Sequence, residues 1–322
     1  YKVARRVSTL PVYDGEKVVM RLLDESGKGL NLDQIGLREQ PLAVLRRVMG
    51  RPHGMILVTG PTGSGKTTTL YAVLQELNEP GVNISTVEDP IEYRMPRVNQ
   101  TQVKPKIGLT FANGLRSLVR QDPDIIMVGE IRDEETASLA VNAALTGHLV
   151  LSTLHTNSAA GALPRLRDMK VEAFLLASTL NLVMAQRLVR RLCEKCRVKK
   201  NVDRELVKEL SEEFDTELVL AALRREKVVP ESAGWDDVSV YQYQPDKACN
   251  VCRDGYRGRV GIYEVMEITP ELQELIMPET TSVQLEQAAR KQQQFVTMLE
   301  DGFIKVVQGV TTLEEVLRVA RE

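Results

Sequence analysis

The segment GMILVTGPTGSGKTTT at residues 54–69 restricts the possible folds of this chain more than any other stretch. Its apolar start, GMILVTG, predicts a buried strand, and GPTGSGKT matches the phosphate-loop pattern G-x-x-x-x-G-K-[ST] in every fixed position. The residues that follow, TTTLYAVLQELN, predict a helix whose N-terminus faces bound phosphates. A strand, a glycine-rich loop and a helix in this order indicate a nucleotide-binding α/β fold.

The residue types of this loop suit nucleotide phosphates. Glycines let backbone N–H groups curl around phosphate oxygens. Lys66 then reaches the β- and γ-phosphates, and the hydroxyl of Thr67 ligates Mg²⁺. The sequence therefore predicts ATP or ADP with Mg²⁺ as ligands. The residues expected to contact the nucleotide are Gly60, Thr62, Gly63, Ser64, Gly65, Lys66, Thr67 and Thr68.

A parallel sheet needs further strands whose carboxyl ends meet at the same crevice. Three apolar segments fit this requirement: VNISTVE at 82–88, DIIMVGE at 124–130 and HLVLSTLH at 148–155. Helical patterns at 111–121 and 133–146 lie between them. The alternation predicts a parallel sheet with helices between its strands.

Two of these strands end in glutamate. Glu130 follows the apolar run after an intervening glycine, and we expect it to hold Mg²⁺ through a water molecule. Glu88 opens the acidic stretch EDPIE, in which Asp89 and Glu92 also carry carboxylates. Taken alone, this stretch fits a solvated turn equally well, because Asp-Pro is common in turns. Beside a phosphate loop, Glu88 becomes the candidate for polarising the attacking water.

Two histidines bracket the strand at 148–155. At about 3.3 Å per residue, His148 and His155 would lie roughly 23 Å apart. Only His155, at the carboxyl end, can then lie near the γ-phosphate, while His148 is expected to close the preceding turn. The alternative for His155 is a loop or helix-capping histidine.

All four cysteines occur in two C-x-x-C pairs, CEKC at 193–196 and CNVC at 249–252. Four thiolates in two such pairs suit tetrahedral zinc. We therefore expect Cys193, Cys196, Cys249 and Cys252 to bind a structural Zn²⁺, which would leave no open position for catalysis. A redox pair or unlinked structural cysteines are the alternatives.

Composition limits the remaining classes of function. The 322 residues suffice for about two domains. The net charge of −2, the 4% aromatic content and a single basic run at 187–200 argue against a nucleic-acid partner. No apolar stretch approaches the ~20 residues needed to span a bilayer. Because the chain starts at Tyr1 inside a strand-like pattern, we expect it to be part of a longer protein.

In combination, the motifs resemble those of the secretion ATPase superfamily, the hexameric motors of type II secretion and type IV pilus assembly (the GspE/PilB type). The phosphate loop is one of these motifs, and TVEDPIEY is similar to the Asp box of the family. RQDPDIIMVGEIRD is similar to its Walker B segment, and TGHLVLSTLHTN to its His box. The two C-x-x-C pairs and GYRGRVGIYEV complete a resemblance that covers essentially the whole chain.

The resemblance implies a RecA-like ATPase domain in a ring of six identical subunits. It also implies a preceding domain that donates arginines to the nucleotide of a neighbouring subunit, and Arg6 and Arg21 match these arginines. Without the resemblance, both would be read as solvated strand residues. An inner-membrane platform protein is the implied partner, which places the motor in the cytoplasm, peripheral to the inner membrane.

The same resemblance suggests the domain limits. Residues 1–26 would end an α+β N-terminal motor domain, 27–34 would be a flexible linker, and 35–322 would form the ATPase domain. Within the latter we expect a zinc region at 190–258 and a helical part at 270–322. The excursion at 197–247 predicts one or two amphipathic helices, with a solvated face favoured over a partner-binding one. Gly302 and Gly309 are expected at helix ends.

Three functions remain at this stage. The preferred one is an ATPase motor that assembles pilin or pseudopilin subunits. A pilus retraction motor of the same superfamily is the second, although the paired C-x-x-C motifs argue against it. A helicase is the third, and the absence of a strong basic or aromatic surface makes it the weakest.

Overall fold

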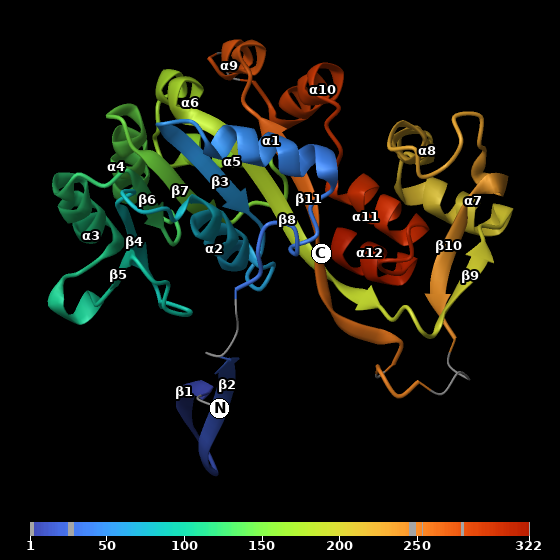
Figure 1. Ribbon diagram of the computed structural model, residues 1–322, viewed down its shortest axis with the longest axis horizontal. Helices are drawn as coiled ribbons and strands as arrows, with labels where there is room; N and C mark the ends of the chain where they lie inside the picture. Colours follow the sequence, from blue (N-terminus) through green and yellow to red (C-terminus); the bar gives the residue numbers. More distant parts are fainter. Residues whose placement is uncertain (1–2, 25–28, 245–248, 253, 278–279, 322) are drawn as a thin grey trace.

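The computed structural model describes residues 3–24, 29–244, 249–252, 254–277 and 280–321, without the side chains of residues 3–6 and 21–24. The described strands form a seven-stranded sheet and two separate two-stranded sheets (Figure 1). Among the described residues, no helix combines the length and the apolar character required to cross a bilayer.

The central sheet has the strand order β11-β8-β3-β7-β6-β4-β5. All its neighbouring strands run parallel except β11, which pairs antiparallel with β8. The predicted α/β class is therefore confirmed, and the predicted parallel sheet has one antiparallel strand in addition. The strands are β3 (Gly54–Thr59), β4 (Ile84–Glu88), β5 (Val98–Gln102), β6 (Ile125–Val128), β7 (Leu149–Leu154), β8 (Leu180–Leu192) and β11 (Tyr256–Glu267).

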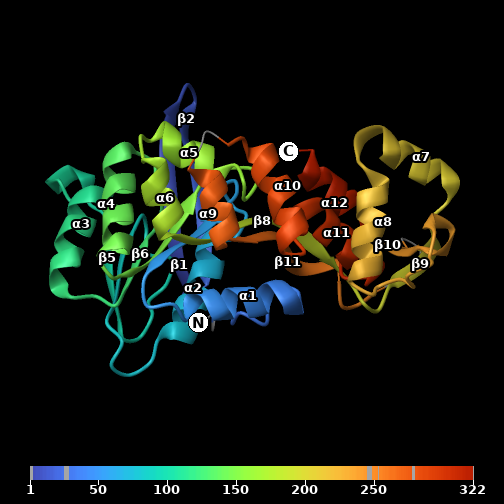
Figure 2. The ribbon, with the colours of Figure 1, turned by 90° about the horizontal axis from the view of Figure 1, so that it is seen from above.

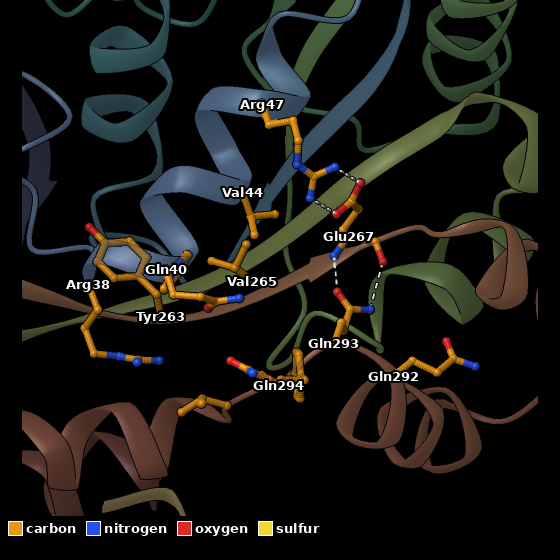
Figure 3. Close-up of a pocket in the computed structure, with 13 residues that line it drawn as sticks. Arg38, Gln40, Val44, Arg47, Tyr263, Val265, Glu267, Gln292, Gln293 and Gln294 are labelled. Atoms are coloured by element: carbon orange, nitrogen blue, oxygen red, sulfur yellow. Dashed lines mark hydrogen bonds and ion pairs between the residues drawn. The ribbon is translucent and has the colours of Figure 1, made fainter. Parts of the chain in front are cut away.

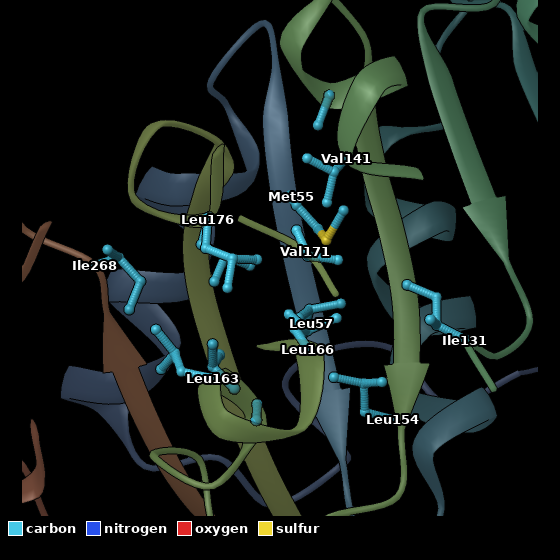
Figure 4. Packing of buried hydrophobic residues seen from close by; sticks show 14 of the residues in the cluster. Met55, Leu57, Ile131, Val141, Leu154, Leu163, Leu166, Val171, Leu176 and Ile268 are labelled. Carbon is cyan, nitrogen blue, oxygen red and sulfur yellow. The ribbon is translucent and has the colours of Figure 1, made fainter. Parts of the chain in front are cut away.

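Helices cover both faces of this sheet, which explains why every residue of β3, β4, β6 and β7 is buried. On β3, Met55 and Leu57 contribute to one apolar cluster, and Ile56 and Val58 to another on the opposite face. Figure 4 shows the first cluster, and Figure 2 shows the helices of the two faces as separate layers. The second cluster is covered by α1 (Glu39–Met49) and α2 (Lys66–Leu77). The first is covered by α3 (Phe111–Leu118), α4 (Glu134–Leu145), α5 (Ala162–Asp168), α6 (Ala173–Thr179), α9 (Pro270–Ile276) and α10 (Ser282–Gln292).

The excursion between the cysteine pairs contains two amphipathic helices, where its pattern predicts one or two. Both turn leucines and valines toward a third apolar cluster, which they share with the last helices of the chain. The cluster draws side chains from α7 (Arg204–Glu213), α8 (Thr216–Arg225), β10 (Ser239–Tyr243), α11 (Met298–Val307) and α12 (Leu313–Ala320). Strand β9 (Arg197–Asn201) pairs antiparallel with β10. Short 3₁₀ helices occur at Pro105–Ile107, Val119–Gln121 and Trp235–Asp237.

Two local expectations need correction. Gly302 does not end a helix but lies inside α11. Glycine is needed there because a Cβ would come within 2.5 Å of the Val316 side chain on α12. Gly309 does follow α11, with a φ of +72°. The proposed linker is also not loose throughout, because the side chain of Leu32 is fully buried in the cluster beneath α1. Residues 25–28 lie outside the described residues.

The first two strands, β1 (Val3–Val12) and β2 (Gly15–Asp24), pair with each other and with no other described strand, and they lie apart from the central sheet (Figure 1). Their register places Arg6 directly opposite Arg21. The side chains of both arginines lie outside the described residues.

Candidate functional site

The phosphate loop joins the end of β3 to the first residue of α2, as its sequence predicts. Gly60 and Gly65 have φ values of +145° and +91°, in a region that residues with a Cβ rarely adopt. A Cβ on Gly60 would also lie 2.5 Å from the carbonyl oxygen of Gln186. Glycine is therefore required here both for the backbone conformation and for the close approach of β8.

Lys66, at the start of α2, is largely buried inside the loop. Its Nζ donates hydrogen bonds to the carbonyl oxygens of Gly60, at 2.7 Å, and Pro61, at 3.0 Å. Burial lowers the pKa of Lys66, and the nearby charge of Glu130 opposes this shift. The lysine is thus held by the carbonyls of the loop, close enough to Glu130 for the two charges to interact.

The ends of β6 and β7 bring Glu130 and His155 together. The Nε2 atom of His155 lies 3.3 Å from Oε2 of Glu130, although the two residues are 25 positions apart. His148, in contrast, lies at the opposite end of β7, where its Nδ1 is 2.9 Å from the carbonyl oxygen of Ala143. The structure therefore separates the two histidines as the length of the strand predicts.

Arg132 is a member of this group that the sequence analysis missed. Its guanidinium forms an ion pair with Oε1 of Glu130 at 2.5 Å, and 64% of its side chain is exposed. The signal was present, since the arginine lies two residues after Glu130. Spacing alone does not show, however, that the side chain turns back toward the carboxylate.

Glu88 ends β4, as expected, but its carboxylate is buried. It accepts hydrogen bonds from the hydroxyls of Tyr71 on α2 and Thr86 on β4, and from Nε2 of Gln100 at 3.2 Å. Burial raises the pKa of Glu88, and these three donors oppose that shift. In this conformation the Glu88 carboxylate is therefore held in the interior by its hydrogen-bond donors.

The other carboxylates of the acidic stretch have different surroundings. Asp89 is exposed and Glu92 is half-buried. The carboxylate of Glu92 makes no hydrogen bond or ion pair within the described parts of the chain. It lies close enough to Glu88 for its charge to raise the pKa of Glu88. Glu92 is thus a second candidate for the role that the sequence assigns to Glu88.

The four cysteines converge, as their spacing predicts. Their Sγ atoms all lie within 4.8 Å of one another, with 3.8 Å between Cys193 and Cys249 and 3.4 Å between Cys196 and Cys252. The backbone N–H of Val251 is the main cause that lowers the pKa of Cys249 to about 6. Four clustered sulfurs fit the donor set of tetrahedral zinc.

A separate polar cleft of about 370 Å³ lies between α1, β11 and the segment after α10 (Figure 3). An ion pair between Arg47 and Glu267 closes one side of it. The side chain of Gln293 holds both backbone groups of Glu267. None of the residues predicted to bind nucleotide or metal lines this cleft.

Comparison with protein families gives a match over nearly the whole chain. The family described as type II/IV secretion system protein matches residues 1–318. The chain is 50% identical over 319 residues to the type II secretion system ATPase E of Vibrio cholerae. It is 47% identical over 317 residues to the type IV pilus assembly ATPase PilB of Pseudomonas aeruginosa. Each alignment covers 98% of this chain but only 58% and 52% of the relatives, so the chain spans about half of their length.

Solved structures support the same fold. The Legionella pneumophila ATPase DotB aligns with a TM-score of 0.66 and 23% identity, covering 99% of this chain and 73% of DotB. A pilus retraction motor PilT with bound ADP aligns with a TM-score of 0.65 and 26% identity, covering 99% of this chain and 78% of PilT.

Proposed function

Because the chain belongs to the type II/IV secretion system protein family, we propose that it is the ATPase part of a filament-assembly motor. In this proposal, ATP hydrolysis drives the addition of pilin or pseudopilin subunits in a type IV pilus or a type II secretion system. One observation carries the proposal. The phosphate loop follows β3, and β3 lies in the same sheet as β6 and β7, after which Glu130 and His155 meet. ATP turnover by the protein, measured as phosphate release, is its first test.

The nucleotide would bind at the RecA-like phosphate loop. Lys66 would exchange the two carbonyls that it now contacts for the β- and γ-phosphates. The oxygen ligands of Thr67 and Glu130 suit Mg²⁺, which would neutralise phosphate charge when bound. His155, in contact with Glu130, would lie near the γ-phosphate. Backbone and side-chain contacts to the phosphates would come from Gly60, Thr62, Gly63, Ser64, Gly65 and Thr68.

The carboxylate that polarises water is proposed to come from the acidic stretch after β4. Glu88 would have to leave three hydrogen-bond donors in order to act, whereas Glu92 would not. The surroundings therefore favour Glu92 for the reaction. In this arrangement Glu88 would hold the end of β4 against α2.

Substitutions separate these two roles. We expect Glu92→Gln to retain ATP affinity and to lower kcat by about a hundredfold or more, as for the loss of a general base. Glu88→Gln should lower the thermal midpoint, because a neutral amide fits the buried donors poorly, with a smaller loss of kcat. Asp89→Asn, at an exposed position, is the matched control. The larger kcat loss in Glu88→Gln would return the role to Glu88.

Assembly and partners extend the proposal to the whole protein. We propose a homohexamer in which residues 1–26 belong to the N-terminal motor domain and 35–322 to the ATPase domain. An inner-membrane platform protein would receive the mechanical work, so that the motor lies in the cytoplasm at the inner membrane.

A retraction motor is the second candidate, favoured by the similarity to the PilT structure. The four clustered cysteines and the higher identity to assembly and secretion ATPases favour the first candidate. Deletion of the gene separates them. Loss of filaments or of secretion supports assembly, whereas an excess of surface pili supports retraction.

We propose zinc as the ligand of the cysteine cluster, with Cys193, Cys196, Cys249 and Cys252 as its four donors. Cys193 follows β8 directly, and its backbone N–H donates to the carbonyl oxygen of Gly255, just before β11. The metal would therefore fasten the ends of two strands that continue into the central sheet.

Elemental analysis is expected to find one zinc per chain. Chelation should increase hydrogen exchange at 190–258 and leave β3 and β4 protected, because these strands belong to a large separate core. Cys193→Ser should reproduce this local effect. A folded protein without zinc, with all four cysteines oxidised, would contradict the assignment.

A further inference from the structure

Gln186 lies on β8 directly beside the phosphate loop, although no motif of the loop includes it. The register pairs Ala185 with Thr59, the last residue of β3, so that β8 continues past β3 at Gln186. The side chain of Gln186 is only 1% exposed. A Cβ on Gly65 would lie 3.0 Å from its Nε2 atom. The loop therefore closes over this side chain.

Both ends of the Gln186 amide are engaged. Its Nε2 donates to the carbonyl oxygen of Ser64 at 2.6 Å, and its Oε1 accepts from the hydroxyl of Thr69 at 2.7 Å. The carbonyl of Ser64 can only accept, so the amide nitrogen must face it. The hydroxyl of Thr69 then serves as the donor that keeps the amide in this orientation.

The bond to Ser64 has a geometric consequence for the loop. In a planar trans peptide, the C=O and the following N–H point in opposite directions. Drawing the Ser64 carbonyl toward β8 therefore turns the N–H of Gly65 away from β8. Phosphate binding by such a loop depends on the direction of its N–H groups.

We propose that Gln186 is a positioning residue that orients the Ser64–Gly65 peptide, so that the N–H of Gly65 faces the phosphates. The inference rests on the proposed function, since it concerns ATP at the same loop. It adds to the determinants of nucleotide affinity a residue that is 122 positions from Ser64 in the sequence. Thr69 supports it by fixing the amide.

The test compares ATP affinity, KM and kcat for two substitutions of Gln186. Gln186→Glu can still accept from Thr69 but presents an oxygen to the Ser64 carbonyl. Gln186→Met removes the donor without adding charge and serves if the first variant does not fold. We expect KM for ATP to rise about tenfold or more in both, with kcat within about twofold, because a buried carbonyl loses its donor.

Thr179→Val is the matched control, because Thr179 is buried on α6 and donates one hydrogen bond, to the Leu175 carbonyl at 2.6 Å. It should lower the thermal midpoint without changing KM. Thr69→Val should raise KM less than the Gln186 variants, and Thr69→Ser should restore it.

Two results would overturn the inference: an unchanged KM in folded Gln186 variants, or an equal rise in KM in the Thr179→Val control. The second result would mean that general destabilisation, rather than orientation of the loop, sets the affinity. A parent protein that does not hydrolyse ATP at all would instead contradict the proposed function, so the two failures are distinguishable.

Discussion

Lys66→Ala is expected to abolish ATP turnover and to weaken ATP binding by about tenfold or more. The reason is that Lys66 is the cation that this loop offers to the β- and γ-phosphates from the interior side. Charge stabilisation and positioning account for most of phosphoryl-transfer catalysis. A hydrogen bond to a charged group also contributes roughly 1.5–3 kcal/mol to binding.

Phosphate release and equilibrium binding of a fluorescent ATP analogue measure the two effects. Lys170→Ala is the matched control, because Lys170 is exposed and pairs with Glu134 on the surface. It should leave both quantities unchanged. If Lys66→Ala retained turnover close to that of the parent protein, ATP would have to react at another place in the chain.

Local sequence predicted the elements whose pattern is complete within a single segment of the chain. The phosphate loop, β4, β6 and β7 each combine an apolar run with a chemical group at its end. In contrast, the apolar-rich segment 173–184 contains the boundary between α6 and β8. Periodicity cannot place such a boundary, because a buried strand and a buried helix look alike in sequence.

The edge strand β5 was missed for the opposite reason. Its sequence, VNQTQ, is polar, and none of its residues is fully buried. The pairing of Ile84 with Val98 and the following positions makes it a strand. This pairing depends on tertiary placement, which propensity does not contain.

The candidate site likewise combines features that local sequence predicts with features that depend on tertiary packing. Spacing along the strands correctly placed Glu130 and His155 at one edge and His148 at the other. It did not show the direction of the Glu88 side chain, because the bond from Tyr71 depends on how α2 packs on β4. The contact between Gln186 and Ser64 likewise joins parts of the chain that only the folded sheet brings together.

The remaining large effect concerns hydrolysis shared between subunits. Arg6 and Arg21 occupy opposite positions of a hairpin whose strands join no other sheet in the described parts of the chain. Arginine suits phosphate oxygens because it is permanently charged and offers a fork of donors. We propose that these arginines complete the nucleotide site of a neighbouring subunit. Arg21→Ala should then lower turnover by roughly 10³–10⁵, the range for an arginine finger, with little change in ATP affinity.

Mixing two inactive variants tests this sharing directly. Rings that contain both Arg21→Ala and Lys66→Ala chains include interfaces at which an intact arginine meets an intact phosphate loop, so part of the turnover should return. Lys17→Ala, at an exposed position on the same strand as Arg21, is the control and should be fully active alone. Turnover per chain should also rise with protein concentration as rings assemble. Full activity of an isolated monomer would reject a shared site, because one chain would then supply every group that the reaction needs.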